Sequence, residues 1–482
     1  MRDIRKSFTA GGALAAALTL FVGLSAGAQT AVPASATHAL PPGPCAAVEP
    51  LIAAGNLAAT DFESDAAEAD FGQAIAQAPR CATGWLRRGE LRLGNFDNDG
   101  AAADAKAAVA MAPRSAEAYG LLGEAEMRPW TQGGQFDDKD HKQAQAILAD
   151  LSRAIDLGLA DSRILAARAT IYAALADYDH AFADSDRAIA QDPHNADLFI
   201  TRGDIWRAKG DRDRALADFA QARAIAPDEE DGYSNAANLY DSHNDIDAAI
   251  AMLSQGLDRP NPIDDLYGRR ADLYERKGDF AHAIADRTAA IDADHLPRAT
   301  HYRQRAETYA AAGDIDHALA DADMYILLDP KFDGAYIARG DIEFQAGRVA
   351  AGRTDFDHAR TLRSERSTYT DNEMCWDQAA AGVDLDKALA DCNAALAKSP
   401  RYANALDSRG FVYFRMGQYD AAIADYTAAL KLRARMASSL FGRGLAEQKK
   451  GMTTEAAADL AAARAADPTI DETFKGYGVT AN

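Results

Sequence analysis

Two short motifs in this sequence contain the residue types that catalytic or metal sites use. Residues 23–27, Gly-Leu-Ser-Ala-Gly, match the G-x-S-x-G pattern that exposes a nucleophilic serine after a strand, but no strand-forming segment precedes them. Residues 97–100, Asp-Asn-Asp-Gly, contain the start of a calcium loop without its distant glutamate, which favours a plain turn. After residue 28 the sequence has no phosphate-binding glycine loop, H-E-x-x-H helix or nucleophile–base pair. We therefore expect a chain that is not an enzyme and has no cofactor or metal site.

The N-terminus has the three parts of a secretory signal peptide. Basic residues between positions 2 and 6 precede an apolar stretch at residues 10–24, and small residues at 26–28 form a cleavage site. This stretch is shorter than the about 20 residues that a membrane span requires, and no later apolar run is longer. We expect cleavage after Ala28, which also removes the serine motif, and a periplasmic or secreted protein without a membrane span.

A pattern of 34 residues then recurs end to end along the chain. Each copy places small and aromatic residues at fixed intervals, as in Phe199, Gly203, Trp206, Ala215, Phe219, Ala222 and Pro227, and again in Leu406, Gly410, Tyr413, Ala422, Tyr426 and Ala429. This spacing predicts two amphipathic helices joined by a short turn. Units begin near Val48, Ala82, Ala116, Ser162, Ala196, Glu230, Asp264, Ala299, Asp333, Tyr369, Ala403 and Ala437.

The pattern resembles that of the tetratricopeptide repeat family. The resemblance implies an all-α fold, a right-handed α-solenoid superhelix of about twelve helix-turn-helix repeats whose neighbours cover one another's apolar surfaces. We therefore divide the chain into a signal peptide, a flexible Pro- and Ala-rich leader, the repeat array and a C-terminal capping segment, at residues 1–28, 29–47, 48–470 and 471–482.

Arginine is the seventh residue of eight units, and aspartate follows it sixteen positions later in each. The pairs are Arg88 and Asp104, Arg168 and Asp184, Arg202 and Asp218, Arg270 and Asp286, Arg305 and Asp321, Arg339 and Asp355, Arg409 and Asp425, and Arg443 and Asp459. The first residue lies on one helix of the predicted hairpin and the second on the facing helix. We expect eight structural ion pairs.

The four cysteines, Cys45, Cys81, Cys375 and Cys392, allow three pairings. In the stack that the resemblance implies, helices pack about 10 Å apart, so the first unit cannot reach the tenth. This leaves Cys45 with Cys81 and Cys375 with Cys392. No histidine lies near in a metal-binding spacing, so we expect disulfides rather than metal-bound or free thiols, as suits an exported protein.

Family resemblance places binding positions at about the second, fifth, ninth and twelfth residues of each unit. Seven of the ninth residues are acidic, namely Glu90, Glu124, Asp204, Asp272, Glu307, Asp341 and Asp377, whereas Phe411 and Phe414 offer an apolar contact near the end of the array. The net charge of −22 disfavours nucleic acid and anionic lipid and favours a protein or peptide with basic segments. A merely solvated acidic surface explains the same residues, and both interpretations stay open.

The third unit carries an extra stretch at about residues 128–139, which contains Trp130 and Phe136. It is either a contact loop on a rigid scaffold or a plain insertion whose aspartates cap the next helix.

We expect an exported, non-enzymatic scaffold or adaptor that binds a protein or peptide in the concave groove of the superhelix. The alternative is a structural subunit or assembly factor of a bacterial envelope export complex, which would co-purify stably with a large assembly.

Overall fold

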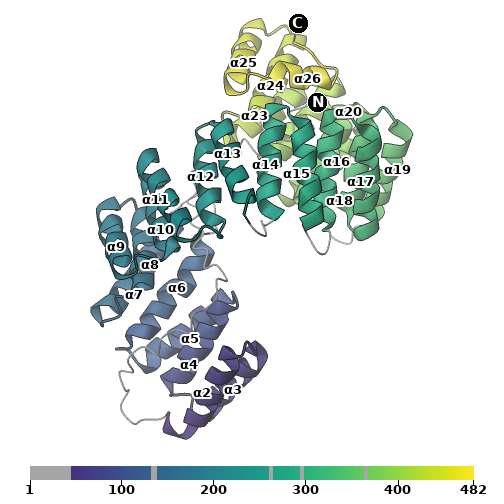
Figure 1. Ribbon diagram of the computed structural model, residues 1–482. Coiled ribbons are helices and arrows are strands. Elements are labelled where there is room, and N and C mark those ends of the chain that lie inside the picture. Colours follow the sequence, from purple (N-terminus) through teal and green to yellow (C-terminus); the bar gives the residue numbers. More distant parts are fainter. Residues whose placement is uncertain (1–44, 132–137, 260–263, 294–297, 363–366, 482) are drawn as a thin grey trace. The chain divides into compact units, whose positions relative to one another are not determined.

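The computed structural model describes residues 45–131, 138–259, 264–293, 298–362 and 367–481 (Figure 1). Within these ranges all regular secondary structure is helical, and the chain forms two compact units that divide between residues 262 and 263. The predicted signal peptide and most of the predicted leader lie outside the described residues. None of the helices in the described ranges combines the length and apolar character that a membrane crossing requires.

The N-terminal unit contains six helical hairpins after a short 3-10 helix. Its elements are η2 (Ala46–Val48), α2 (Glu49–Thr60), α3 (Ser64–Gln77), α4 (Ala82–Gly94), α5 (Asn98–Met111), α6 (Ala116–Thr131), α7 (Asp138–Asp156), α8 (Ser162–Ala174), α9 (Tyr178–Gln191), α10 (Ala196–Lys209), α11 (Arg212–Ile225), α12 (Asp231–Ser242) and α13 (Ile246–Leu257).

The C-terminal unit contains six further hairpins and one final short helix. Its elements are α14 (Asp264–Lys277), α15 (Phe280–Ala293), α16 (Ala299–Ala312), α17 (Ile315–Leu328), α18 (Asp333–Gln345), α19 (Val349–Thr361), α20 (Thr368–Ala381), α21 (Leu385–Lys398), α22 (Ala403–Arg415), α23 (Tyr419–Leu432), α24 (Ala437–Lys449), α25 (Thr453–Ala466) and α26 (Ile470–Gly476).

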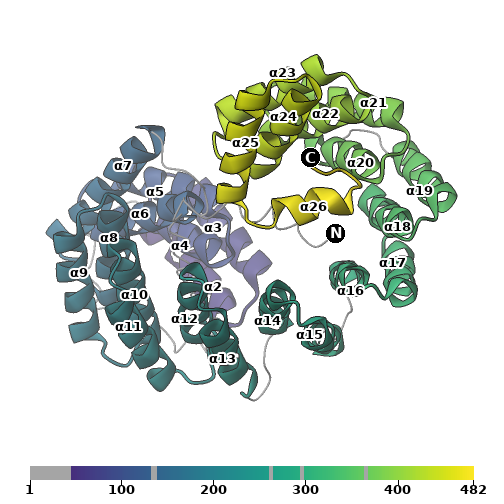
Figure 2. The same cartoon turned by 90° about the horizontal axis from the view of Figure 1, so that it is seen from above.

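The hairpins follow the predicted repeats closely. We call the first helix of each hairpin helix A and the second helix B; every helix A begins within one residue of a predicted unit start. Neighbouring hairpins contact each other through helix B of one and helix A of the next, as α11 and α12 do, and through successive A helices, as α8, α10 and α12 do (Figure 2). The fold is therefore an α-solenoid of helical hairpins, which confirms the predicted class.

Small residues permit the close crossing of helices A and B. A Cβ atom added to Gly203 on α10 would lie 2.6 Å from the ring of Phe219 on α11, and the buried Ala215 lies at the same crossing. Likewise, a Cβ atom on Gly410 would lie 2.9 Å from the ring of Tyr426. Such approaches are shorter than van der Waals contact, so the alternation of small and aromatic residues in the sequence reflects interlocking of the two helices.

All eight predicted Arg–Asp pairs are present. In each pair the arginine Nε and one terminal nitrogen donate to the two carboxylate oxygens of the aspartate, over 2.5–2.9 Å. The aspartates are buried on helix B. A bidentate pair of this kind fixes the rotation of one helix against the other, and its repetition makes the pairs a shared structural element.

The tenth hairpin replaces this pair with a disulfide. Cys375 occupies the arginine position on α20 and bonds to Cys392 on α21. Asp391 keeps the aspartate position and is 2% exposed, and it accepts a hydrogen bond of 2.7 Å from Arg360 of the preceding hairpin. Burying a carboxylate without a cation costs free energy. Arg360 of the preceding hairpin supplies the positive charge, because Cys375 stands where eight other hairpins have arginine.

The second disulfide joins Cys45 to Cys81 across the two ends of the first hairpin, and both disulfides have the pairing that the sequence favoured. Disulfides are typical of proteins in oxidising compartments. We expect peptide mapping of the native chain without reductant to recover two linked peptides, Cys45 with Cys81 and Cys375 with Cys392, and alkylation to label no thiol. Labelled thiols or exchanged partners would contradict these pairings.

Candidate functional site

Most of the acidic ninth residues bind arginines of the same chain. Their partners are Arg87 for Glu90, Arg163 for Glu124, Arg207 for Asp204, Arg287 for Asp272 and Arg303 for Glu307. Asp341 accepts a hydrogen bond of 2.6 Å from Gln345, and Asp377 is half-buried on α20. Because these internal cations offset the carboxylates, the row of ninth residues presents less negative charge than the sequence alone indicates.

Two of these carboxylates are also inaccessible. Glu124 is 8% exposed and Asp204 is 1% exposed, since each lies where its helix A packs against neighbouring helices. Neither can offer a direct contact to a partner, so the prediction for these two residues is wrong. Glu90 and Asp272 are exposed, and their role in binding stays a prediction.

The apolar contact predicted at Phe411 and Phe414 is already used inside the chain. Phe411 is 1% exposed and Phe414 is 8% exposed. Helix α26 covers Phe411: the ring of Phe474 lies 5.5 Å and that of Tyr477 5.9 Å from the Phe411 ring, centroid to centroid. The prediction of an open apolar surface is therefore wrong, because the last helix of the chain fills it.

The predicted insertion is described only in part. Trp130 belongs to α6, which extends to Thr131, and nothing is shown of its side chain. Phe136 lies outside the described residues. Whether this stretch is a contact loop or a plain insertion stays a prediction.

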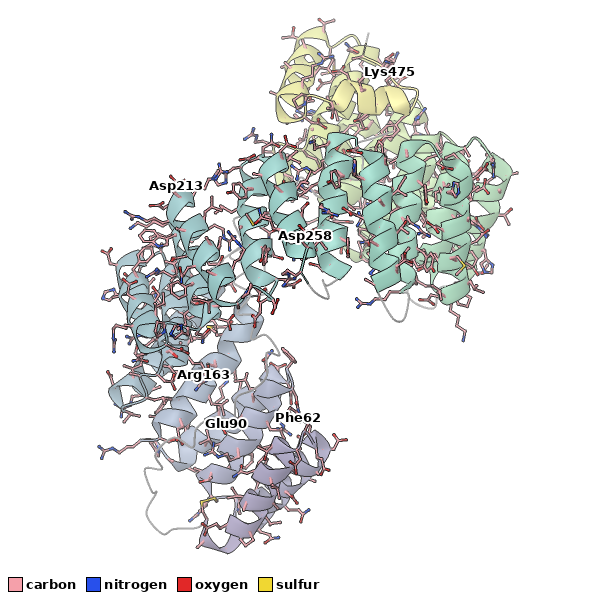
Figure 3. The ribbon with its side chains drawn as sticks, in the orientation of Figure 1. Phe62, Glu90, Arg163, Asp213, Asp258 and Lys475 are labelled. Atoms are coloured by element: carbon pink, nitrogen blue, oxygen red, sulfur yellow. A yellow bond between two sulfur atoms is a disulfide. The ribbon has the colours of Figure 1, made fainter. Side chains whose placement is uncertain are left out.

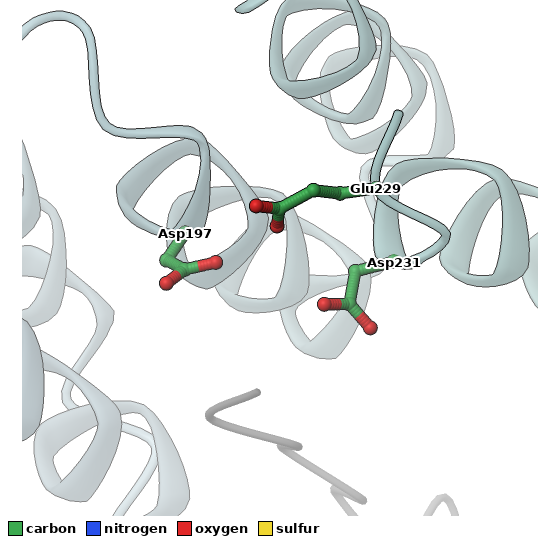
Figure 4. Close-up of side chains that lie close together, drawn as sticks. All are labelled: Asp197, Glu229 and Asp231. Atoms are coloured by element: carbon green, nitrogen blue, oxygen red, sulfur yellow. The ribbon is translucent and has the colours of Figure 1, made fainter. Parts of the chain in front are cut away.

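A cluster of three carboxylates lies between two hairpins of the N-terminal unit. Asp197 is in the first turn of α10, Asp231 is in the first turn of α12, and Glu229 precedes α12. One oxygen of each residue lies within 4.8 Å of the others, and the three side chains converge in Figure 4. All three residues are half-buried. We call Asp197, Glu229 and Asp231 the acidic cluster.

Burial and mutual repulsion both disfavour full ionisation of this cluster. Burial, followed by the charges of Glu229 and Asp231, raises the pKa of Asp197 from 3.8 to about 7. Asp204, further along α10, has a pKa raised to about 6, mainly by burial; Arg207 opposes the rise and Asp231 adds to it. A cation bound between these carboxylates would favour their ionised forms and would itself be stabilised by them.

The sequence contained a signal for this cluster that the ninth residues did not provide. Asp197 and Asp231 are each the second residue of a unit, and the second residue is one of the positions at which the family resemblance predicts binding. Two adjacent units carry aspartate there, whereas Glu229 lies in the connection between them. Its approach to the other two depends on how one hairpin stacks on the next, which the repeat pattern does not specify.

The chemistry of the cluster suits a cation. Three carboxylates suit a lysine ammonium or an arginine guanidinium, which bind carboxylate oxygens through charge-assisted hydrogen bonds. They also provide part of the oxygen shell of a divalent ion such as Ca²⁺, which takes six to eight oxygen ligands. Asp197, Glu229 and Asp231 are thus the described residues best placed to hold a metal ion or a basic side chain.

One family model and several solved structures match this chain. A protein-family model described as TPR repeat matches residues 410–451, which contain α23, α24 and the end of α22. No curated protein sequence matches the chain significantly.

Several solved structures resemble the chain at low identity. The thermophilic TPR protein TTC0263 of Thermus thermophilus is 22% identical, with a TM-score of 0.34 over 40% of this chain and 98% of its own. Yeast Tom70 is 14% identical, with a TM-score of 0.44 over 90% of this chain and 94% of its own. YrrB, described as a TPR protein with an unusual peptide-binding site, is 22% identical, with a TM-score of 0.31 over 38% of this chain and 89% of its own. At these values none of them indicates a ligand for this chain.

Proposed function

We propose that this chain is an exported, non-enzymatic scaffold that binds a protein or peptide segment by taking a lysine or arginine side chain into the acidic cluster. The observation that carries the proposal is the convergence of three carboxylates, those of Asp197 and Asp231 on the A helices of adjacent hairpins and that of Glu229 in the connection before α12. Carboxylates that repel one another at half-buried positions are stabilised when a cation enters between them. Repeat solenoids bind partners along surfaces of this kind, which supports a scaffold role.

Export to the periplasm or outside the cell is supported by two features. The N-terminal sequence has the arrangement of a signal peptide, and both disulfides are of the kind that persists in oxidising compartments. A subunit of an envelope export complex would share these features, and the acidic cluster would then hold a basic segment of a neighbouring subunit.

The test uses a short peptide of alternating lysine and serine, titrated into the chain by calorimetry. We expect the triple variant D197N/E229Q/D231N to bind it about tenfold more weakly or worse, because the charge-assisted contacts are lost. The control variant D179N/D213N/D258N replaces the same number of carboxylates at exposed positions of the same unit, and it should bind almost as the unmodified chain does. Figure 3 labels Asp213 and Asp258. An equal loss in both variants would overturn the proposal, since it would show a general charge effect. Saturable calcium binding that only the cluster variant loses would assign the cluster to a metal instead.

The raised pKa of Asp197 predicts a dependence on pH. In the free chain this carboxyl stays protonated at pH values well above its ordinary pKa of 3.8. A cation must therefore compete with a proton below about pH 7. We expect affinity for the lysine–serine peptide to rise as the pH increases through about 7, and D197N to flatten that rise. The stability of the fold changes with pH in the opposite direction. Between about pH 4 and 7 the folded chain keeps a proton that the unfolded chain releases, so the free energy of unfolding falls as the pH rises through this range. Calorimetry and urea titrations at several pH values measure both slopes.

A further inference from the structure

One edge of the C-terminal unit is basic, although the chain as a whole has a net charge of −22. The edge consists of the connection between α21 and α22, at residues 399–402, and the connection between α23 and α24, at residues 433–436. Neither residues 392–406 nor residues 426–446 contain an aspartate or a glutamate. The exposed basic residues of these two stretches are Lys398, Arg401, Lys431, Arg433 and Arg435.

Arg433 holds the two connections side by side. Its Nη1 atom donates a hydrogen bond of 2.9 Å to Oδ1 of Asn404, in the first turn of α22. Arg401 and Arg435 are 34 residues apart, so they occupy the same place in adjacent hairpins. Helices of adjacent hairpins pack about 10 Å apart. The basic residues of both connections therefore lie within reach of a single short segment.

The positive charge of this edge is not neutralised by the chain itself. Lys398 contacts Asp371 over 3.3 Å. Asp407 is 4% exposed and accepts hydrogen bonds from Ser438 and Ser439 at the start of α24. Among the described residues, no aspartate or glutamate forms an ion pair with the other four basic residues. We call these four the basic edge: Arg401, Lys431, Arg433 and Arg435.

The starts of two A helices add to the positive potential of the basic edge. α22 and α24 begin directly after the two connections, and neither first turn contains an acidic residue. Their N-cap residues, Tyr402 and Met436, supply no side-chain acceptor to the first backbone N–H groups. In the N-terminal unit, by contrast, the carboxylate of Asp161 caps α8. The N-terminal end of a helix carries a partial positive charge, which favours an anion nearby.

We propose that the basic edge is a docking site, independent of the acidic cluster, for a short acidic segment of a partner protein. Three of its four residues are arginines, and guanidinium groups bind carboxylates through charge-assisted hydrogen bonds. A short segment can contact the basic edge alone. Nucleic acid or an anionic membrane would also bring its charge against the rest of an acidic chain, which repels it.

The test titrates a short peptide of alternating glutamate and serine into the chain by calorimetry. The edge variant, R401Q/K431Q/R435Q, should bind it about tenfold more weakly or worse, because three charge-assisted contacts are lost. Added salt should weaken binding to the unmodified chain, since it screens exposed charges. The melting temperature of the edge variant should stay almost unchanged, because the replaced residues are exposed and have no ion pair in the described part of the chain.

A matched control removes the same charges from other connections. Arg80, Arg114 and Lys331 are exposed, and each lies 32 residues after the start of its unit, as Arg401 and Arg435 do. The control variant R80Q/R114Q/K331Q also replaces two arginines and one lysine. It should bind the glutamate–serine peptide almost as the unmodified chain does.

The basic edge and the acidic cluster can be tested separately. The triple variant of the acidic cluster should keep its affinity for the glutamate–serine peptide, and the edge variant should keep its affinity for the lysine–serine peptide. The proposal would be overturned if the glutamate–serine peptide did not bind, if the edge variant bound it as tightly as the unmodified chain, or if the control variant lost as much affinity. Tighter binding of an oligonucleotide, of phosphatidylglycerol vesicles or of a second copy of the chain, lost in the edge variant, would also overturn it by assigning the basic edge to another occupant.

Discussion

Replacing Arg409 with methionine is expected to lower the free energy of unfolding of the C-terminal unit by about 3 kcal/mol, because a buried carboxylate loses its cation. Arg409 donates to Asp425 over 2.6 and 2.8 Å, and the side chain of Asp425 is 11% exposed. Methionine keeps the length of the apolar stem but removes the charge. Urea denaturation measures the loss, and hydrogen exchange should show it first in α22 and α23.

The double variant R409M/D425L separates the pair from its parts. If the single variant is unstable because Asp425 is stranded, removing that carboxylate as well should recover much of the loss. We interpret the arginine and the aspartate as each compensating the charge of the other. Additive losses would contradict this: the double variant would then lose as much free energy of unfolding as R409M and D425L lose together. The tenth hairpin supports the expected result, because Asp391 there recruits Arg360 where the local arginine is replaced by Cys375.

Phe474→Ala is expected to cost about 3–5 kcal/mol and to expose the apolar surface beneath α26. Phe474 is 1% exposed, and its ring lies 4.7 Å from Phe441 and 5.5 Å from Phe411, centroid to centroid. Loss of this ring leaves a cavity between α26 and the A helices of the last hairpins. Thermal unfolding should shift to lower temperature, and a dye that binds apolar surface should fluoresce more strongly with the variant.

Lys475 provides the control for that substitution. It is the next residue on α26, its side chain is 63% exposed, and it contacts Glu472 of the same helix (Figure 3). Lys475→Ala should leave both thermal unfolding and dye fluorescence almost unchanged. If Phe474→Ala also left them unchanged, α26 would not seal this part of the chain, and Phe411 would again be a candidate contact for a partner.

The sequence was a good guide wherever one hairpin contains the whole interaction. The spacing of Gly203 and Phe219 reflects the crossing of two neighbouring helices. The sixteen residues from Arg409 to Asp425 lead from helix A through the turn to the facing position on helix B. Such contacts repeat with the period of the chain. Periodicity therefore predicts them, together with the start of every helix A.

The sequence was a poor guide where separate hairpins or the chain end meet. Phe411 has the character of an open apolar contact, but its burial depends on where α26 folds, and α26 is outside the repeat. The sequence predicts an exposed carboxylate at Asp204, but packing buries this residue and Arg207 forms an ion pair with it. Glu229 joins the acidic cluster through the stacking of two hairpins. The period of the repeat carries no information on these contacts.

A crystal structure of the chain with the lysine–serine peptide tests the central claim most directly. The account predicts a lysine Nζ within about 3 Å of carboxylate oxygens of Asp197, Glu229 and Asp231. A peptide bound elsewhere, with no cation between these three carboxylates, would contradict it.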